Sequence, residues 1–169
     1  MARGVPRRRM TVTTVVSYED LQCPDCAIYR RMVDNDLRER FGANVAFEHR
    51  DFPLAKHDWA RAAAVASRYF YFIDAELGNQ FRAYCYKGQP GISKANFEEK
   101  LFEFGTSHGL QSHVLNAALQ DEASIQAVER DYQEGVARGV ERTPTVFVNA
   151  QMLVEKFTAE ELSKAIEKA

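Results

Sequence analysis

The sequence predicts an α/β protein whose elements follow the order β-α-β, then a helical block, then β-β-α. Short runs rich in β-branched residues occur only near the two ends of the chain. Between them, residues 56–139 carry helical patterns and no convincing strand. The chain has 169 residues, which is the size of one domain. A chain of this length buries roughly 70% of its unfolded surface.

The composition excludes several classes of protein. Hydrophobic residues make up 46% of the chain, which is too many for a disordered protein. No apolar run approaches the ~20 residues that a membrane-spanning helix needs, so we expect no membrane insertion. The net charge of -2 argues against a general nucleic-acid binder, and we expect no nucleic-acid partner. Three cysteines are too few for a disulfide framework.

The start of the chain is basic, with Arg3, Arg7, Arg8 and Arg9 and no acid in residues 1–18. It resembles the start of a signal peptide, but neither an apolar stretch nor a small-residue cleavage pattern follows. A twin-arginine export signal would also need an apolar stretch. The sequence thus shows no export signal, and the default expectation is a cytoplasmic protein. A periplasmic or other extracytoplasmic location is expected instead if a leader has been removed.

The first three elements follow from local patterns. Thr11–Tyr18 is dominated by β-branched residues and predicts a strand. Pro24–Phe41 predicts a helix, because a proline stands near its start, apolar residues recur at near-helical spacing, and Gly42 follows its end. Asn44–Arg50 alternates in polarity and predicts a second strand, which Asp51-Phe52-Pro53 ends.

The helical block contains five predicted helices and one loop. The helices are Asp58–Leu77, which ends at Gly78-Asn79, then Asn79–Tyr86, Ala95–Phe104, Ser112–Leu119 and Glu122–Ala137, with the loop at Lys87–Gly91. Trp59 and the aromatic run Tyr69–Phe72 are expected to form the core of this block. Cys85 is expected to be a small buried residue.

Strand patterns return at Thr145–Val148 and, beyond a turn, at Met152–Val154. Thr158 and Glu161 then form a capping box, which opens a final helix to about Lys168. Each end of the chain has strands that lack partners, so we interpret the block as an insertion. The predicted parts are a discontinuous domain of residues 11–55 and 140–169 and a helical insertion of residues 56–139.

Cys23-Pro24-Asp25-Cys26 is the most informative motif, because it stands between a predicted strand and a predicted helix. The two-residue spacing lets both sulfurs meet across one helical turn. Free backbone N–H groups and the positive end of the helix dipole favour a thiolate at Cys23. Pro24 supplies helical φ where its missing N–H costs nothing. These features predict thiol-disulfide exchange.

Two other interpretations of the cysteine pair stay open. A zinc site needs four ligands, but Cys85 and the four histidines show no ligand-pair spacing, so we expect no metal site. A purely structural disulfide is the second alternative. Within the redox interpretation, the Asp25 carboxylate is expected to disfavour a nearby thiolate and oppose the helix dipole.

Thr143-Pro144 precedes the third predicted strand, and by itself it is an ordinary turn. Together with Tyr18–Cys26, Arg50–Leu54 and Gly139–Asn149, it makes the chain resemble the DsbA-like branch of the thioredoxin superfamily over residues 11–168. This resemblance implies a thioredoxin-like fold with a helical insertion. It also implies that the protein is a thiol-disulfide oxidoreductase.

The resemblance assigns roles to individual residues. Cys23 would be the exposed attacking cysteine and Cys26 the buried resolving one. Thr143-Pro144 would form a cis peptide bond, and the Thr143 backbone would pair with an extended substrate. Pro24 and Asp25, between the two cysteines, would tune the redox chemistry.

The chain departs from the family pattern in three ways, of which the first is the missing export signal, since such proteins usually work outside the cytoplasm. Ser17 stands where many relatives carry a buried acid, and strand alternation is expected to direct the nearby Glu19 elsewhere. Arg142 replaces a common glycine, and its charge would help stabilise a Cys23 thiolate and offset Asp25. His57 is expected to be a surface or packed histidine rather than an active-site residue.

The expected substrates are proteins or peptides that contain cysteine, and an unidentified redox partner would recycle the site. No metal or organic cofactor is required. Asp25 and the apparent cytoplasmic start favour reduction, whereas the resemblance favours oxidation. One alternative is a kappa-type glutathione transferase or a 2-hydroxychromene-2-carboxylate isomerase-like enzyme, which would use glutathione. Another is a non-catalytic module that binds peptides at Thr143.

Overall fold

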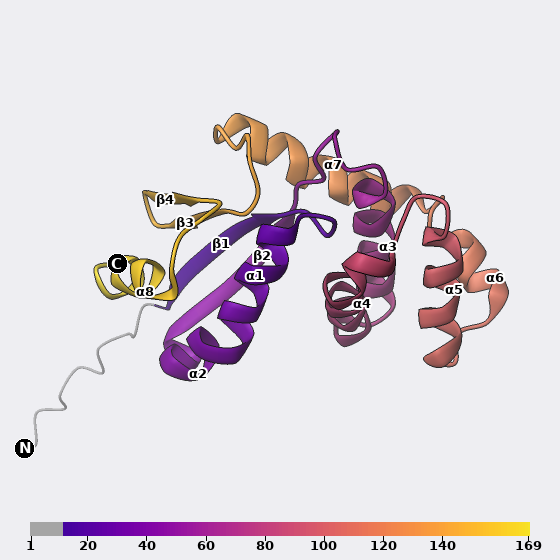
Figure 1. The fold of residues 1–169 in the computed structure, drawn as a ribbon, viewed down its shortest axis with the longest axis horizontal. Helices are drawn as coiled ribbons and strands as arrows, with labels where there is room; N and C mark the ends of the chain where they lie inside the picture. Colours follow the sequence, from indigo (N-terminus) through magenta and orange to yellow (C-terminus); the bar gives the residue numbers. More distant parts are fainter. Residues whose placement is uncertain (1–11) are drawn as a thin grey trace, which may run out of the picture.

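The computed structural model describes residues 12–169, so the basic segment that contains Arg3, Arg7, Arg8 and Arg9 and the predicted strand start at Thr11 lie outside the described residues. Four strands form one sheet in the order β2-β1-β3-β4 (Figure 1). The strands are β1 (Thr13–Glu19), β2 (Val45–Asp51), β3 (Thr145–Val148) and β4 (Gln151–Val154).

The helices confirm the predicted order of elements. They are α1 (Pro24–Met32), α2 (Arg38–Phe41), α3 (Ala60–Ile73), α4 (Ala75–Gly88), α5 (Phe97–Ser107), α6 (Ser112–Ala117), α7 (Glu122–Ala137) and α8 (Ala159–Glu167). A π-helix covers Val33–Leu37, and short 3₁₀ helices cover Gly42–Asn44 and Gln89–Gly91. The capping box predicted at Thr158 opens α8. No helix within residues 12–169 is long and apolar enough to cross a membrane.

The sheet separates two apolar layers. β1 runs parallel to β2 and antiparallel to β3. Val15 faces one layer, in which Tyr29 of α1 and Leu162 of α8 are buried. Tyr18 faces the other layer, where Tyr132 of α7 packs with the buried Phe52. Because successive side chains of a strand point to opposite faces of the sheet, β1 packs against helices on both faces.

The helix predicted over Pro24–Phe41 is interrupted. The π-helix at Val33–Leu37 separates α1 from α2, and both of its end residues are fully buried. A π turn adds a residue to the helical repeat and rotates the following face. The register inferred from one regular helix therefore does not continue past Met32. Ile28 precedes the π-helix and is 51% exposed although its spacing placed it on the apolar face, because α1 buries Cys26, Ala27 and Tyr29 instead.

The boundary predicted at Gly78-Asn79 was also wrong. α3 ends at Ile73, and the Asp74 side chain caps α4 by accepting a hydrogen bond from the Leu77 backbone N–H at 3.0 Å. Gly78 lies inside α4, where an added Cβ would stand 2.6 Å from the Tyr71 Cβ. The glycine permits a close approach of α3 and α4 instead of ending a helix.

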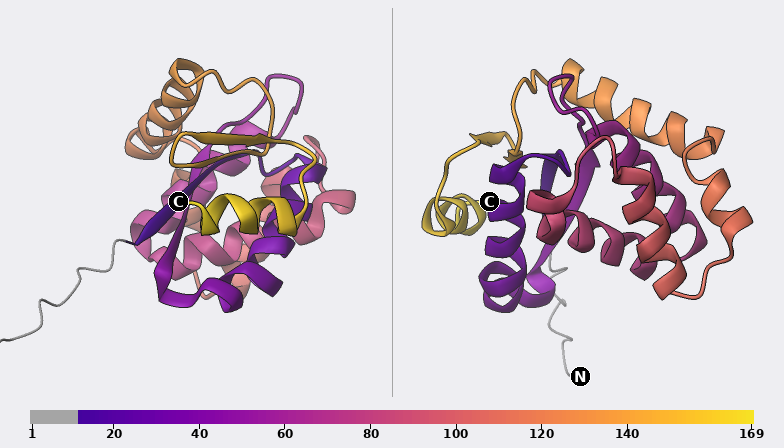
Figure 2. Two further views of the ribbon diagram at one scale, coloured as in Figure 1. Left: turned by 90° about the vertical axis from the view of Figure 1, so that its left-hand side faces the viewer. Right: turned by 45° about the vertical axis from the view of Figure 1, so that its right-hand side comes forward.

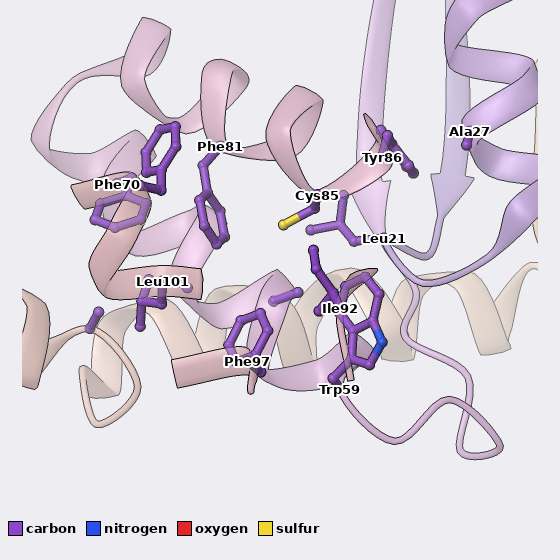
Figure 3. Close-up of a cluster of buried hydrophobic side chains, with 14 of the residues drawn as sticks. Leu21, Ala27, Trp59, Phe70, Phe81, Cys85, Tyr86, Ile92, Phe97 and Leu101 are labelled. Carbon is purple, nitrogen blue, oxygen red and sulfur yellow. The ribbon is translucent and has the colours of Figure 1, made fainter. Parts of the chain in front are cut away.

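The helical insertion lies beside the sheet, on the side away from α8 (Figures 1 and 2). Its core contains Trp59, Phe70 and Phe81 (Figure 3), and the same buried cluster includes Cys23 and Cys26. The aromatic run contributes less than expected, because Tyr71 is 41% exposed and Phe72 is 54% exposed. The predicted boundaries between the sheet domain and the insertion, at residues 55–56 and 139–140, stay a prediction. One apolar cluster contains residues from both sides of the first boundary.

Candidate active site

Cys23 is the residue that caps the N-terminus of α1, and Pro24 occupies the first turn. The Cys23 backbone N–H donates to the Asp20 carbonyl at 3.1 Å, which closes the turn between β1 and α1. Cys23 is 6% exposed and Cys26 is 0% exposed. Cys23 is therefore less exposed than the resemblance implied, although it is the more accessible of the two cysteines.

The Cys23 thiol is more acidic than an ordinary cysteine. The pKa of Cys23 is lowered to about 6, and the largest cause is a hydrogen bond from the Cys26 thiol. Burial opposes this shift, whereas the Thr143 side chain and the backbone N–H groups of Cys26 and Asp25 add to it. Asp25 thus acts through its backbone, and the net direction is opposite to the one expected from its carboxylate.

Cys26 has the opposite character. Its pKa is raised well above the ordinary value, first by burial and then by the hydrogen bond to Cys23 and the negative charges of Cys23 and Glu19. The Asp20 backbone N–H donates to the Cys26 sulfur at 3.4 Å and counteracts this in part. The motif therefore contains one thiol that ionises readily and one that retains its proton.

The loop before β3 faces the cysteine pair, and its Thr143–Pro144 peptide bond is cis. The Cys23 thiol donates to the Thr143 carbonyl at 3.3 Å. The Thr143 hydroxyl is buried and makes no hydrogen bond within residues 12–169. It becomes a donor when Cys23 is a thiolate, which explains why the Thr143 side chain lowers the pKa of Cys23.

The same loop carries Arg142, the residue expected to stabilise the Cys23 thiolate. Its guanidinium donates to Glu155 at 3.1 Å, and its side chain is 66% exposed. A pair this exposed is strongly screened by water. A role of Arg142 in tuning the redox chemistry stays a proposal, because its nearest charged partner is Glu155.

A cavity of about 520 Å³ opens beside Cys23. Its lining residues are Cys23, Pro24, Asp25, Leu54, Ala55, Lys56, His57, Glu141, Arg142, Thr143 and Glu155. The structure thus joins Pro24, Asp25, Arg142 and Thr143 around one space, as the sequence analysis grouped them. It also places His57 there, which the sequence analysis expected to be a surface or packed histidine rather than an active-site residue.

A buried acid does lie near Cys26, but it is Glu19 rather than position 17. The Ser17 hydroxyl donates to Glu19 at 2.6 Å, so both side chains are on one face of β1. Residues two apart in a strand share a face, so the sequence alone could have placed the Glu19 side chain on the same face as Ser17. Burial raises the pKa of Glu19, but Arg82 and Arg30 outweigh it and lower the pKa to about 2.

The insertion supplies residues to the site that no local pattern singled out. Arg82 of α4 donates to Glu19 at 3.0 Å, and Tyr86 donates to the same carboxylate at 2.7 Å. The Gln89 amide donates to the carbonyls of Leu21 at 2.8 Å and Cys23 at 3.0 Å. The insertion therefore fixes both the buried acid and the loop that carries the attacking cysteine.

Cys85 lies in the apolar cluster of the insertion (Figure 3). It is fully buried, and burial raises its pKa well above the ordinary value. Such a thiol is inert to exchange. Within residues 12–169, no group of three or more His, Cys, Asp or Glu side chains is arranged to hold a metal ion.

Comparisons with known proteins agree with this arrangement. A family model described as thioredoxin matches residues 9–168. A Na(+)/H(+) antiporter NhaA from Herminiimonas arsenicoxydans is 28% identical over 159 residues, which are 91% of this chain and 23% of that protein. The chain thus spans less than a quarter of the length of this relative.

Two solved structures are similar to the whole fold. BdbD from Bacillus subtilis has a TM-score of 0.80 at 23% identity, with 92% of this chain and 86% of that chain covered. The thiol-disulfide exchange protein alpha-DsbA2 from Wolbachia pipientis has a TM-score of 0.77 at 18% identity, with 95% and 83% covered. With its cysteine pair at the start of α1, a cis proline opposite, and a helical insertion, the chain belongs to the thioredoxin family.

Proposed function

We propose that the protein is a thiol-disulfide oxidoreductase, and that Cys23 and Cys26 form its redox pair. The observation that carries this proposal is the difference between two neighbouring thiols. The pKa of Cys23 is lowered to about 6, whereas that of Cys26 is raised well above the ordinary value. One sulfur is then a nucleophile at neutral pH while the other holds a proton, as stepwise exchange requires.

The exchange follows from this difference. In the reducing direction, the Cys23 thiolate attacks a substrate disulfide, a Cys23–substrate S–S bond forms, and the second substrate sulfur leaves with the electron pair. Cys26 then loses its proton and attacks the Cys23 sulfur, which breaks the Cys23–substrate bond, releases the first substrate sulfur as a thiolate and leaves the Cys23–Cys26 disulfide. Oxidation of a substrate dithiol is the reverse sequence.

The acidity of Cys23 favours the oxidising direction. Stabilising the thiolate stabilises the reduced pair, which raises its reduction potential. At pH 7, a fall in the pKa of Cys23 from 9.0 to about 6 corresponds to an increase of about 30 mV in the reduction potential of the pair. This value is an upper limit, because solvent in the cavity screens the interactions. This supports the direction that the resemblance implied over the reducing direction that Asp25 suggested.

The proposed substrates are polypeptides that contain cysteine, and the proposed recycling partner is a second dithiol or disulfide of different potential. Thr143 lies 2% exposed at the wall of the cavity, and its carbonyl already accepts the Cys23 thiol. A substrate segment that pairs with Thr143 would replace this hydrogen bond once Cys23 enters the mixed disulfide. The reduction potential of the pair, compared with that of its compartment, decides whether it oxidises or reduces these substrates.

The decisive experiment is a redox titration of the protein in glutathione buffers, with the free thiols alkylated at each potential and counted by mass. We expect two thiols to disappear together, and Cys85→Ala to leave the transition unchanged. Cys23→Ser should abolish it. A protein in which Cys23 and Cys26 show no joint transition would refute the proposal. Glutathione-dependent activity that survives Cys26→Ser would favour the transferase or isomerase alternative.

A further inference from the structure

His57 and Cys23 line the same cavity, although 34 positions separate them in the chain. His57 follows the Pro53 turn that ends β2, and its backbone N–H donates to the Leu54 carbonyl at 3.0 Å. Its side chain is 16% exposed. The imidazole is therefore held in place but remains open to whatever enters the cavity.

A buried carboxylate fixes the orientation of this imidazole. The Asp20 side chain is fully buried and accepts the backbone N–H groups of Gln22 and Leu54, each at 2.7 Å. It lies 2.7 Å from His57 Nδ1. An ionised carboxylate only accepts hydrogen bonds, so Nδ1 carries the proton, and Nε2 is the nitrogen left for the cavity.

Protonation of the departing sulfur would speed thiol-disulfide exchange in this cavity. When Cys23 attacks, the departing substrate sulfur carries a negative charge inside the cavity, and a thiol of higher pKa leaves more slowly. At the moment of attack the Cys26 thiol is engaged as a donor to Cys23. The other charged groups that face the cavity are Asp25, Lys56, Glu141, Arg142 and Glu155. Among all these groups, imidazole is the one whose proton normally exchanges near neutral pH.

We propose that His57 is a catalytic residue that transfers a proton to and from the substrate sulfur, with Asp20 as its positioning residue. This inference rests on the proposed function. In the reducing direction, the Cys23–substrate bond forms and the substrate S–S bond breaks. The leaving sulfur takes the electron pair and then the proton from His57 Nε2, which becomes neutral. In the oxidising direction, neutral His57 removes the proton from a substrate thiol before that thiol attacks the mixed disulfide.

Two substrates separate this role from a structural one. The sulfur that leaves a peptide disulfide between ordinary cysteines is an alkyl thiolate, which departs faster when it takes the proton. The sulfur that leaves an aryl disulfide such as dithiobis(nitrobenzoate) is a stable aryl thiolate, which gains little from the proton. The reduced protein is mixed with each substrate under single-turnover conditions, and the second-order rate constant is measured at pH 7 for wild type and variants.

The main variant is His57→Asn, because its side-chain amide can still donate to Asp20 while the second nitrogen is lost. We expect the rate constant with the peptide disulfide to fall about tenfold, and the one with the aryl disulfide to stay within twofold. His57→Gln, which removes the bond to Asp20 as well, should show the same selectivity. His113→Asn, at an exposed position on α6, is the matched control and should change neither rate.

An equal fall with both substrates would assign His57 a structural role and overturn the proposal. Unchanged rates with both substrates would overturn it as well. Failure of the proposed function is distinct from these outcomes, because wild type would then react with neither disulfide through Cys23. Thermal unfolding of each variant shows that it is folded before the rates are compared.

Discussion

Glu19 of β1 and Arg82 of α4 form an ion pair of 3.0 Å inside the protein, with side-chain exposures of 0% and 5%. Arg82 also donates to Asp51 of β2 at 2.7 Å. One guanidinium from the helical insertion thus neutralises carboxylates from the two parallel strands, β1 and β2. Because Glu19 raises the pKa of Cys26, this pair links the stability of the insertion to the chemistry of the cysteines.

Replacing Arg82 should be costly. Arg82→Met leaves Glu19 and Asp51 buried without their main cation, and breaking a buried pair in this way typically costs about 3–5 kcal/mol. We expect this loss in the free energy of unfolding measured with urea. The control is Arg61→Met, since Arg61 pairs with Glu129 at the surface and such pairs contribute about 0–1 kcal/mol. Equal effects of the two substitutions would contradict the buried network.

Stability should fall in acid. Burial raises the pKa values of Glu19 and Asp51, but arginines outweigh it and lower each to about 2. The unfolded chain binds these protons at ordinary carboxyl pKa values, so the stabilisation is present above about pH 5 and lost toward pH 2. Burial lowers the pKa of His49 to about 3, which adds a loss in the same direction below about pH 6.5.

The measurement is the urea unfolding free energy of the wild-type protein at a series of pH values from 7 to 2. We expect a continuous decrease as the pH falls. In Arg82→Met the decrease through the carboxyl range should be shallower, because the carboxylates have lost the cation that lowers their pKa values. A wild-type stability that stays constant down to pH 3 would contradict these shifts.

The proton on Cys26 should control the acidity of Cys23. Cys26→Ala removes the donor that is the largest cause of the lowered pKa, so Cys23 should lose about tenfold in alkylation rate at pH 7. Cys26→Ser keeps a hydroxyl donor and should retain most of the rate. The pKa is read from alkylation rates between pH 4 and 9. If Ala and Ser behave alike, the hydrogen bond is not the cause.

The Thr143 hydroxyl should stabilise the Cys23 thiolate and contribute little to the stability of the fold. It is buried without a hydrogen-bond partner in the described part of the chain, so Thr143→Val should change the unfolding free energy by no more than about 1 kcal/mol. The variant should nevertheless raise the pKa of Cys23, because the side chain that stabilises the thiolate is gone. A large loss of stability with an unchanged pKa would reverse this assignment.

At Gly135, α7 packs tightly against Phe52 and Tyr18. An added Cβ would stand 2.6 Å from Phe52 Cδ2 and 2.9 Å from Tyr18 Cδ1. Gly135→Ala should therefore lower the unfolding free energy by about 1–3 kcal/mol through overpacking. Gly91→Ala is the control, because an added Cβ there meets nothing within 4 Å. Both variants are compared by urea unfolding, and equal stabilities would mean that α7 can shift to relieve the contact.

Local patterns predicted the order of elements, because strand and helix periodicities and the Thr158 cap depend on neighbouring residues. The π-helix at Val33–Leu37 was not predictable in this way. No glycine or proline marks it, and packing of Val33 and Leu37 into the apolar layer accompanies it. The helix boundary predicted at Gly78 was wrong for a related reason. A glycine that permits two helices to approach closely has the same local pattern as a glycine that ends a helix.

The cysteine pair was predictable because a short motif carries it. The role of Thr143-Pro144 came from the family resemblance, since by itself the dipeptide is an ordinary turn. Glu19 could have been assigned from its two-residue spacing to Ser17. The roles of Arg82 and His57 could not be predicted, since Arg82 is one of many arginines and His57 is an isolated histidine. Their roles come from contacts between segments that are distant in the chain, namely α4 with β1 and the turn after β2 with the loop after β1.

The two hydrogen bonds from Gln89 also limit which backbone groups beside Cys23 are free to pair with another polypeptide. They occupy the carbonyls of Leu21 and Cys23. Thr143 lines the cavity beside Cys23, so the proposed substrate would pair with its backbone instead. Shortening the segment around Gln89 should free the two carbonyls and allow the substrate to pair in more than one way.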